Sequence, residues 1–429
     1  MRVGADRMPF LLAGPVLLAA LISVSTVSPL WAGTAEEPDS ILQKLEHIAL
    51  RAKEAEKAVE KRWLSESLRL HFYGYLDASY TQNFNNPSNR INELRIFDVN
   101  SNQSRFNLAQ FVLKRDVQAG NWLDRTGFKI KFNAGRDSAF IGGNNIGPWT
   151  DFQEYYLQYL VPVGSGLDLK LGQINSIVGY EVVESRHNAN YSRSWLFGLG
   201  QPFTTRGVRA TYEFDKRASL SVGVIEYINS ARGSTSHDPL VETALTLSPS
   251  NRVKLTLYGL AGPRSGASGT SGGTILLAGG FAGLHLTDQL SAVIESYYAN
   301  QSNSSTFSQA KNARWDGVAG YLLYDVNQQW GVRLRGEVFE DAGGFVSCGG
   351  TTAYQPRANV CFGASSVASA PSIAQTLWEF TGTLQYKPVP SLTTRLEYRY
   401  DKSNQNVFQA GGRATSYQPT LSFEGIYAF

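Results

Sequence analysis

The chain has 429 residues, of which 17% are charged and 12% aromatic, and its formal net charge is +3. So small a charge, with no block of Lys or Arg, argues against nucleic-acid binding, because such proteins gather basic residues on one face. Beyond the N-terminal segment, no apolar run reaches the roughly 18 residues that mark a membrane-spanning helix. Moderate hydrophobicity spread over short segments favours an all-β chain, either soluble domains or one large barrel.

The N-terminus has the pattern of a secretory signal. Arg2 and Arg7 precede an apolar stretch, residues 10–24, and small residues up to Ala35 offer cleavage sites. The stretch is shorter than a spanning helix and contains a Gly-Pro pair, which disfavours a membrane anchor. The sequence therefore predicts a signal peptide over residues 1–35 and export from the cytoplasm.

Residues 36–66 read as a short periplasmic helix. Apolar side chains recur at steps of four and three with charged residues between them, which is a heptad pattern. Isolated helices of this length are marginal, so the stripe must pack against something. The possibilities that stay open are packing on the rim of the following domain, fraying in solution, or a coiled coil between protomers. The seam consists of Ile41, Leu45, Ile48, Ala52, Ala55 and Val59.

From residue 67 to the end the apolar period becomes two, which is typical of strands. In the first strand, Leu70 and Phe72 share a face, and Arg69 and His71 lie on the other. Charged side chains cannot lie in hydrocarbon, so the second face should line a water-filled interior. The prediction is a transmembrane antiparallel β-barrel of about sixteen strands over 67–429, in place of a soluble sandwich with its apolar face inside. The expected centres are Tyr73, Ala109, Ile130, Leu157, Leu169, Ala210, Val224, Ala244, Leu255, Phe281, Ile294, Gly320, Leu334, Thr381, Leu396 and Phe423.

Connections between these strands alternate in length. Short ones, such as 162–166 and 326–328, alternate with long Gly-, Ser- or Asn-rich ones, such as 83–102 and 341–375. Short periplasmic turns opposite long external loops are the asymmetry of outer-membrane barrels. The second strand, 106–114, does not alternate cleanly, which suggests a β-bulge.

The parity of each strand predicts which side chains face the interior. The set is mixed in sign with a slight positive excess, which predicts at most a weak preference for anions. The predicted lumen residues are Arg69, Asp77, Lys170, Arg209, Arg333, Arg335, Glu337, Arg395, Glu397 and Arg399.

The 175–203 connection is among the longest and is rich in charged and aromatic residues. A sixteen-strand barrel is too wide for its own side chains to fill, and no plug-sized domain is present. We therefore expect this segment to fold into the pore and form its constriction, the alternative being an external loop. The predicted constriction residues are Glu184, Arg186, His187 and Arg193. His187 also lies near Ser185, but no G-x-S-x-G elbow surrounds a serine, so neither an enzyme nor a catalytic residue is predicted.

Two further features lie toward the C-terminus. Cys348 and Cys361 lie in one Gly- and Ser-rich segment, and such a pair in an exported protein predicts a disulfide. The chain ends on an alternating strand closed by the aromatic Phe429, which is how outer-membrane barrels finish and is the expected assembly signal. The expected partners are outer-membrane lipid, the barrel-assembly machinery and small solutes, with a homotrimer compatible. No cofactor or metal site is predicted.

Several strings resemble the putative β-barrel porin-2 family, the OmpL-like outer-membrane porins. They are NFNNP (83–87), LRIFDVNSNQ (94–103), PVGSGLDLKLGQ (162–173), VESRHNANYSRSWLFGLGQPF (183–203) and GVRATYEF (207–214). The resemblance is strongest over 72–230, and it implies an outer-membrane porin that passes small hydrophilic solutes or ions by diffusion. A receptor or adhesin with long outer loops is the alternative. The resemblance supplies no site residues, and it leaves solute, selectivity and gating open.

Overall fold

The computed structural model describes the greater part of the chain from Arg69 onward. The expected signal peptide and the expected helix over 36–66 lie outside the described residues. The described ranges are 69–141, 144–147, 149–228, 239–264, 273–304, 311–348, 361–362 and 373–429.

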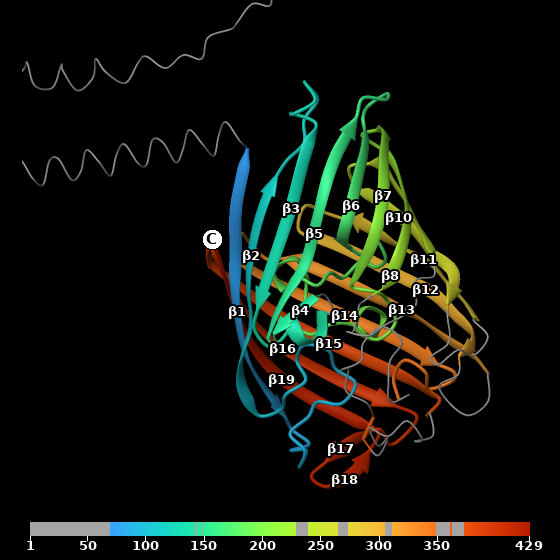
Figure 1. Ribbon diagram of the computed structural model, residues 1–429. Helices are drawn as coiled ribbons and strands as arrows, with labels where there is room; N and C mark the ends of the chain where they lie inside the picture. Colours follow the sequence, from blue (N-terminus) through green and yellow to red (C-terminus); the bar gives the residue numbers. More distant parts are fainter. Residues whose placement is uncertain are drawn as a thin grey trace, which may run out of the picture. The chain divides into compact units, whose positions relative to one another are not determined.

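Sixteen antiparallel strands form a closed barrel (Figure 1). Each strand pairs with its neighbours in chain order, and β1 pairs with β19 to close the ring. The sixteen are β1 (Leu70–Asn83), β2 (Gln103–Arg115), β3 (Thr126–Ala134), β5 (Thr150–Val161), β6 (Leu167–Asn175), β7 (Thr204–Asp215), β8 (Ala218–Ile228), β9 (Leu240–Ser250), β10 (Val253–Arg264), β11 (Gly273–His285), β12 (Leu290–Ser304), β13 (Lys311–Asp325), β14 (Trp330–Asp341), β15 (Gln375–Val389), β16 (Leu392–Ser403) and β19 (Tyr417–Ala428).

The strand predictions are confirmed. Each of the sixteen expected centres lies within one of these strands, and short connections alternate with long ones around the ring. The expected bulge is also present: Asp77 of β1 pairs with Leu108 and Ala78 with Phe106, so that Asn107 is an extra residue in β2. The alternation of apolar and polar residues was sufficient to locate the strands, because the two faces of each strand meet different surroundings.

The long connections contain short elements that the sequence did not predict. They are α3 (Ser138–Ile141), β4 (Asn144–Gly147), η1 (Ser185–His187), α4 (Trp195–Gly198), β17 (Phe408–Ala410) and β18 (Arg413–Thr415). Three or four residues are too few for a hydrophobic period to show, so these segments could be read only as loops.

Polarity is reversed relative to a soluble fold. On β14, Arg335 and Glu337 are 1% and 3% exposed, whereas Leu334 and Val338 on the opposite face are 36% and 39% exposed. The apolar face therefore points outward and the charged face inward, as in a barrel that has lipid outside. Among the described residues, no helix has the length and apolar character needed to cross a membrane.

The first and last strands of the barrel meet at a glycine. Gly74 of β1 donates a backbone hydrogen bond to Phe429 and accepts one from it, each 3.0 Å long. A Cβ at Gly74 would lie 2.1 Å from the Gln110 carbonyl oxygen and 2.8 Å from the Phe429 ring. The Phe429 ring also packs on Phe111, with centroids 5.9 Å apart. The seam between first and last strand thus depends on the absence of a side chain at residue 74.

The outward face should tolerate a larger apolar side chain better than a charged one. Replacing Leu334 by Arg places a charge in hydrocarbon, and we expect the free energy of unfolding to fall by about 2–4 kcal/mol. Denaturant titration of the chain folded into lipid vesicles measures this, with Leu334→Phe as the matched control. Equal stability of the two variants would contradict the outward placement of this face.

Candidate functional site

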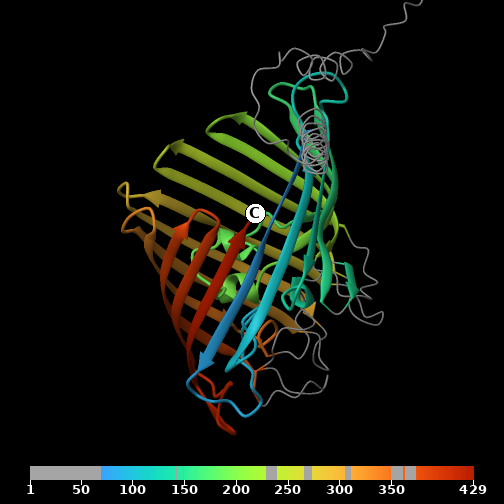
Figure 2. The same ribbon diagram turned by 90° about the vertical axis from the view of Figure 1, so that its left-hand side faces the viewer.

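Residues 176–203, here called the interior segment, lie inside the barrel and contact distant parts of its wall. The segment follows β6 and carries η1 and α4, and both views show it within the ring of strands (Figure 2). The Glu184 carboxylate accepts a hydrogen bond from Lys131 of β3. The Trp195 and Leu196 amides bind β14, at the opposite side of the strand order. The segment therefore bridges the interior from one wall to another.

Two wall carboxylates hold the interior segment by its backbone. Glu337 of β14 accepts the Trp195 N–H at 2.7 Å and the Leu196 N–H at 2.6 Å, one on each oxygen. Glu397 of β16 accepts the Tyr191 N–H at 2.7 Å and the Ser192 N–H at 2.9 Å in the same manner. Because each oxygen of the two side chains accepts from a different amide, each pair fixes two successive peptide groups.

A third carboxylate of the wall reaches the start of the segment. Glu295 of β12 accepts the Tyr180 N–H at 2.9 Å and the Tyr258 hydroxyl at 2.8 Å. Together the three carboxylates bind the segment from β12, β14 and β16, over a wide arc of the wall.

Arg335 of β14 ties these contacts together. Its guanidinium donates to Glu379 at 2.6 Å, to Glu181 at 2.8 Å and to the Ser192 carbonyl at 2.7 Å. The Glu181 side chain in turn accepts the Ser194 N–H at 2.8 Å. An arginine that is fully buried requires such partners, because an unpaired buried charge costs several kcal/mol. The network joins wall and segment with charges that are compensated locally.

Glu184 anchors the segment on the other side. It is 4% exposed and, besides Lys131, accepts hydrogen bonds from Gln153 at 3.0 Å and Asn175 at 3.1 Å. Burial raises the pKa of Glu184, but the adjacent Lys131 ammonium outweighs it and holds the pKa well below its usual range. Glu184 is therefore ionised at neutral pH.

The other three predicted constriction residues differ in exposure. Arg193 is 4% exposed, and its guanidinium donates to the carbonyls of Tyr191, Val182 and Val183. Arg186 is half-buried, with its guanidinium 5.6 Å from the Tyr73 ring centre, and it donates to the exposed His187 ring. Glu184 and Arg193 thus contact protein, whereas Arg186 and His187 have surface open to solvent.

The structure gives the burial and the partners of the predicted lumen residues. Eight are at most 8% exposed, whereas Arg69 and Lys170 keep more surface near the short connections. The ion pairs include Arg69 with Asp124, Lys170 with Asp168, Arg209 with Glu242, Arg333 with Asp325, Arg395 with Glu424 and Arg399 with Asp401. Asp77 accepts the Ser185 hydroxyl at 2.6 Å and the Asn107 amide at 2.9 Å.

The inward face of β8–β13 is mainly apolar, with Glu242 and Glu295 as buried exceptions, and the strand parity did not predict this. A buried cluster joins these strands to α4 and to the long connections. Within it, the Trp195 indole donates to the Leu94 carbonyl and the Trp315 indole to the Gly200 carbonyl, each at 2.9 Å. The signal was available as inward-parity aromatic and aliphatic residues on these strands: Ile225, Leu240, Tyr258, Leu260, Ile275, Leu277, Tyr297, Trp315 and Tyr321.

Two other long connections enter the interior. In 83–102, which the sequence predicts as an external loop, Arg95 is fully buried and donates to Asp401 of β16 at 2.8 Å. Its neighbour Glu93 has a pKa raised to about 7 by burial. Cys348 and Cys361 form a disulfide, with Cα atoms 5.1 Å apart, and both belong to the buried apolar cluster.

The contacts of Ser185 and His187 do not match those of a hydrolase site. The Ser185 hydroxyl is directed to Asp77 and the His187 ring to Arg186, so this serine and histidine do not form a nucleophile and base pair. Among the described residues, no three His, Cys, Asp or Glu side chains gather closely enough to hold a metal ion.

Comparison with known proteins identifies the family. Residues 69–429 match the family described as putative beta-barrel porin-2, OmpL-like. The chain belongs to this family. It is an outer-membrane porin, as its sixteen-strand barrel and its outward apolar face also indicate. A comparison with curated proteins found no match.

Solved structures with the porin's fold are distant in sequence. The outer membrane channel DcaP of Acinetobacter baumannii is 13% identical with a TM-score of 0.53, covering 84% of this chain and 97% of that one. An anion-selective porin from Comamonas acidovorans is 9% identical with a TM-score of 0.54, covering 84% and 99%. A trimer form of OmpT from Vibrio cholerae is 10% identical with a TM-score of 0.52, also covering 84% and 99%. At such identities these likenesses establish the barrel architecture alone.

Removing one anchor should loosen the interior segment while the barrel stays intact. In Glu397→Ala the Tyr191 and Ser192 amides lose their acceptor, and each orphaned buried group costs about 1–3 kcal/mol. We expect faster trypsin cleavage after Arg193 and faster amide exchange over 188–197 in this porin, with unchanged strand circular dichroism.

Glu397→Gln is the matched control, because its carbonyl oxygen still accepts one of the two hydrogen bonds. It should lie between the wild type and the alanine variant. Cleavage and exchange rates that are identical in all three proteins would contradict the anchoring role.

Proposed function

We propose that small hydrophilic solutes and ions diffuse through this porin along a path that the interior segment narrows. The observation that carries the proposal is the bridging of the interior by residues 176–203, bound to β3 on one side and to β14 and β16 on the other. A segment held at both ends leaves less cross-section for water than the empty ring of sixteen strands.

The charges that face water differ from those that hold the segment. Glu184 and Arg193 are buried among partners, so we assign them the role of anchors. Arg186 and His187 are the members of the predicted constriction set with exposed surface. A compensated pair contributes little field at a distance, whereas a partly exposed cation in a narrow opening acts strongly on passing ions.

The lysines of β2, β3 and β6 support a weak preference for anions. Lys114, Lys129 and Lys170 keep 31%, 19% and 25% of their side-chain surface. The Lys114 ammonium and the Arg186 guanidinium lie 6.0 Å and 5.6 Å from the centre of the same Tyr73 ring. Asp116 and Asp168 lie among them, which offsets part of the positive charge. The balance supports modest selection by charge with no single strong site. We propose no catalytic activity, since the Ser185 hydroxyl binds Asp77.

Planar-bilayer recordings under a salt gradient test the path and its preference. Deleting residues 184–197 should raise single-channel conductance, because it removes the segment together with its anchors. Arg186→Glu should move the reversal potential toward the cation side, since one exposed positive charge becomes negative.

Arg186→Lys is the matched control and should keep the wild-type reversal potential. Unchanged conductance in the deletion variant would remove the interior segment from the path. A cation-selective wild-type protein would contradict the proposed preference, and failure of sugars to swell protein-loaded liposomes would favour a receptor or adhesin.

We also propose three kinds of partner: the barrel-assembly machinery, further copies of this chain and outer-membrane lipid. Phe429 closes the seam with β1 and presents an exposed ring at the end of β19, which suits recognition by the barrel-assembly machinery. The OmpT trimer form supports a homotrimer, and analytical ultracentrifugation distinguishes one copy from three. The exposed apolar side chains of the outer face suit contact with outer-membrane lipid.

Loss of the Phe429 side chain should reduce assembly in cells more than it reduces the stability of the folded barrel. In Phe429→Ala the packing on Phe111 is lost but the two backbone hydrogen bonds with Gly74 can still form. We expect less folded barrel in the outer membrane of cells, with refolding into vesicles nearly unchanged. Phe423→Ala, on the same face of β19, is the control, and equal loss in both variants would argue against a terminal signal.

A further inference from the structure

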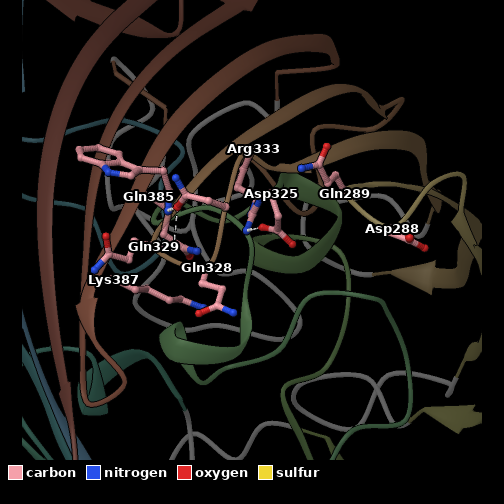
Figure 3. Close-up of a pocket in the computed structure, with 10 residues that line it drawn as sticks. Asp288, Gln289, Asp325, Gln328, Gln329, Arg333, Gln385 and Lys387 are labelled. Carbon is pink, nitrogen blue, oxygen red and sulfur yellow. Dashed lines mark hydrogen bonds and ion pairs between the residues drawn. The ribbon is translucent and has the colours of Figure 1, made fainter.

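A cavity of about 410 Å³ lies at the rim where the short connections are. It is formed by the β11–β12 turn, the β13–β14 turn and the adjacent ends of β14 and β15 (Figure 3). In an outer-membrane barrel the short connections face the periplasm. Its lining residues are Asp288, Gln289, Asp325, Asn327, Gln328, Gln329, Trp330, Arg333, Gln385 and Lys387.

Carboxamides dominate this lining, and its formal charges cancel. Five of the ten residues are Asn or Gln, and two acids balance two bases. The Arg333 guanidinium is already engaged: it pairs with Asp325 and donates to the Tyr324 carbonyl at 2.9 Å and the Val332 carbonyl at 3.2 Å. In Figure 3 this pair lies between Gln289 on one side and Gln328, Gln329 and Gln385 on the other. The cavity therefore offers many neutral donors and acceptors and little net field.

Gln385 is the decisive residue of the cavity. Its side chain lines the cavity and is 6% exposed. Within the described part of the chain, its amide group makes no side-chain hydrogen bond. The amide atoms are not among the polar atoms sealed from solvent, so they open into the cavity, where no described protein group competes for them. A carboxamide so placed is available to a ligand that both donates and accepts.

We propose that this cavity, here called the rim site, binds a neutral saccharide. Each sugar hydroxyl donates and accepts at once, as a carboxamide does, so Gln385 and Gln328 can each pair with adjacent hydroxyls. The free oxygen of Asp325 accepts from a hydroxyl, and the exposed Lys387 ammonium donates to one. The cavity lies within the usual size range of small-molecule sites.

A charged solute suits the rim site less well. A carboxylate ligand would compete with Asp325 for Arg333, and an ammonium ligand would compete with Arg333 for Asp325. The nearly buried Arg333 guanidinium already has Asp325 and two backbone carbonyls as acceptors, so a ligand carboxylate would gain little there, and the Asp325 charge that would attract an ammonium is already offset by Arg333. A zwitterion such as an amino acid would have to displace both, so a polyhydroxylated neutral ligand is favoured.

Isothermal titration of the full-length protein in detergent micelles tests the proposal. The probes are maltose, N,N′-diacetylchitobiose and glycine. We expect a saccharide to bind saturably and glycine not to bind. Gln385→Ala should weaken saccharide binding about tenfold, which corresponds to loss of one or two hydrogen bonds. Equilibrium binding needs no open path, so this outcome is independent of the constriction proposed above.

Control variants keep the test decisive. Gln158→Ala, on β5 across the barrel, should bind as the wild type does. If Gln385→Ala does not fold, Gln328→Ala and Lys387→Ala replace it, because both residues are exposed and their loss leaves the barrel core intact. Binding of neither saccharide, binding of glycine instead, or equal affinity in the rim-site variants and in Gln158→Ala would overturn the proposal.

The same experiment separates the two sources of such a ligand. A free sugar that travels through the porin should resemble maltose, and purified peptidoglycan should then not retain the protein. A glycan strand of the cell wall should resemble diacetylchitobiose, and peptidoglycan should then retain the wild type more than Gln385→Ala. Either result supports a saccharide site at the periplasmic rim.

Discussion

Backbone N–H and C=O groups have no partner in hydrocarbon, so a sheet that crosses a membrane must leave no open edge. In this porin that requirement is met where β1 pairs with β19, and where Gly74 gives room for Phe429. The two-faced sequence pattern is meaningful because the ring is closed. Once the ring is shut, outward side chains meet lipid and inward ones meet water or protein, and every later feature of the interior depends on that separation.

The filled interior buries charged side chains, and in the porin each of these is compensated by groups next to it. Arg335, Glu337 and Glu397 are nearly inaccessible to solvent, yet each is bound to the opposite charge or to backbone amides. The inserted backbone has its own unpaired N–H groups, and wall carboxylates satisfy them two at a time. Wall and segment therefore complete each other, and neither set of polar groups would be stable in a dry interior without the other.

The strand pattern was readable from the sequence because alternation is a local property. Arg335 and Glu337 on one face and Leu334 on the other define both the strand and its orientation. The partners of these residues were not readable, because Glu337 meets Trp195 across 141 intervening residues and no local period encodes that contact. The apolar inward face of β8–β13 was obscured for a different reason: Leu260 or Leu277 look the same whether they face lipid or a packed interior. The buried state of Glu184 and Arg193 likewise depends on tertiary partners, whereas the bulge at Asn107 interrupts the alternation itself and could be seen.

The uneven distribution of apolar side chains around the bore has a geometric consequence. The Trp195 side of the interior segment packs on the apolar cluster of β8–β13, whereas Tyr73, Lys129 and Lys170, near the short connections of the facing arc, keep solvent-accessible surface. Farther along the same arc, Lys131 is buried against Glu184 of the segment. Hydration at the periplasmic end is therefore displaced from the cylinder axis toward β1–β6, and a particle in that eccentric vestibule would touch this arc far more than the rest of the circumference.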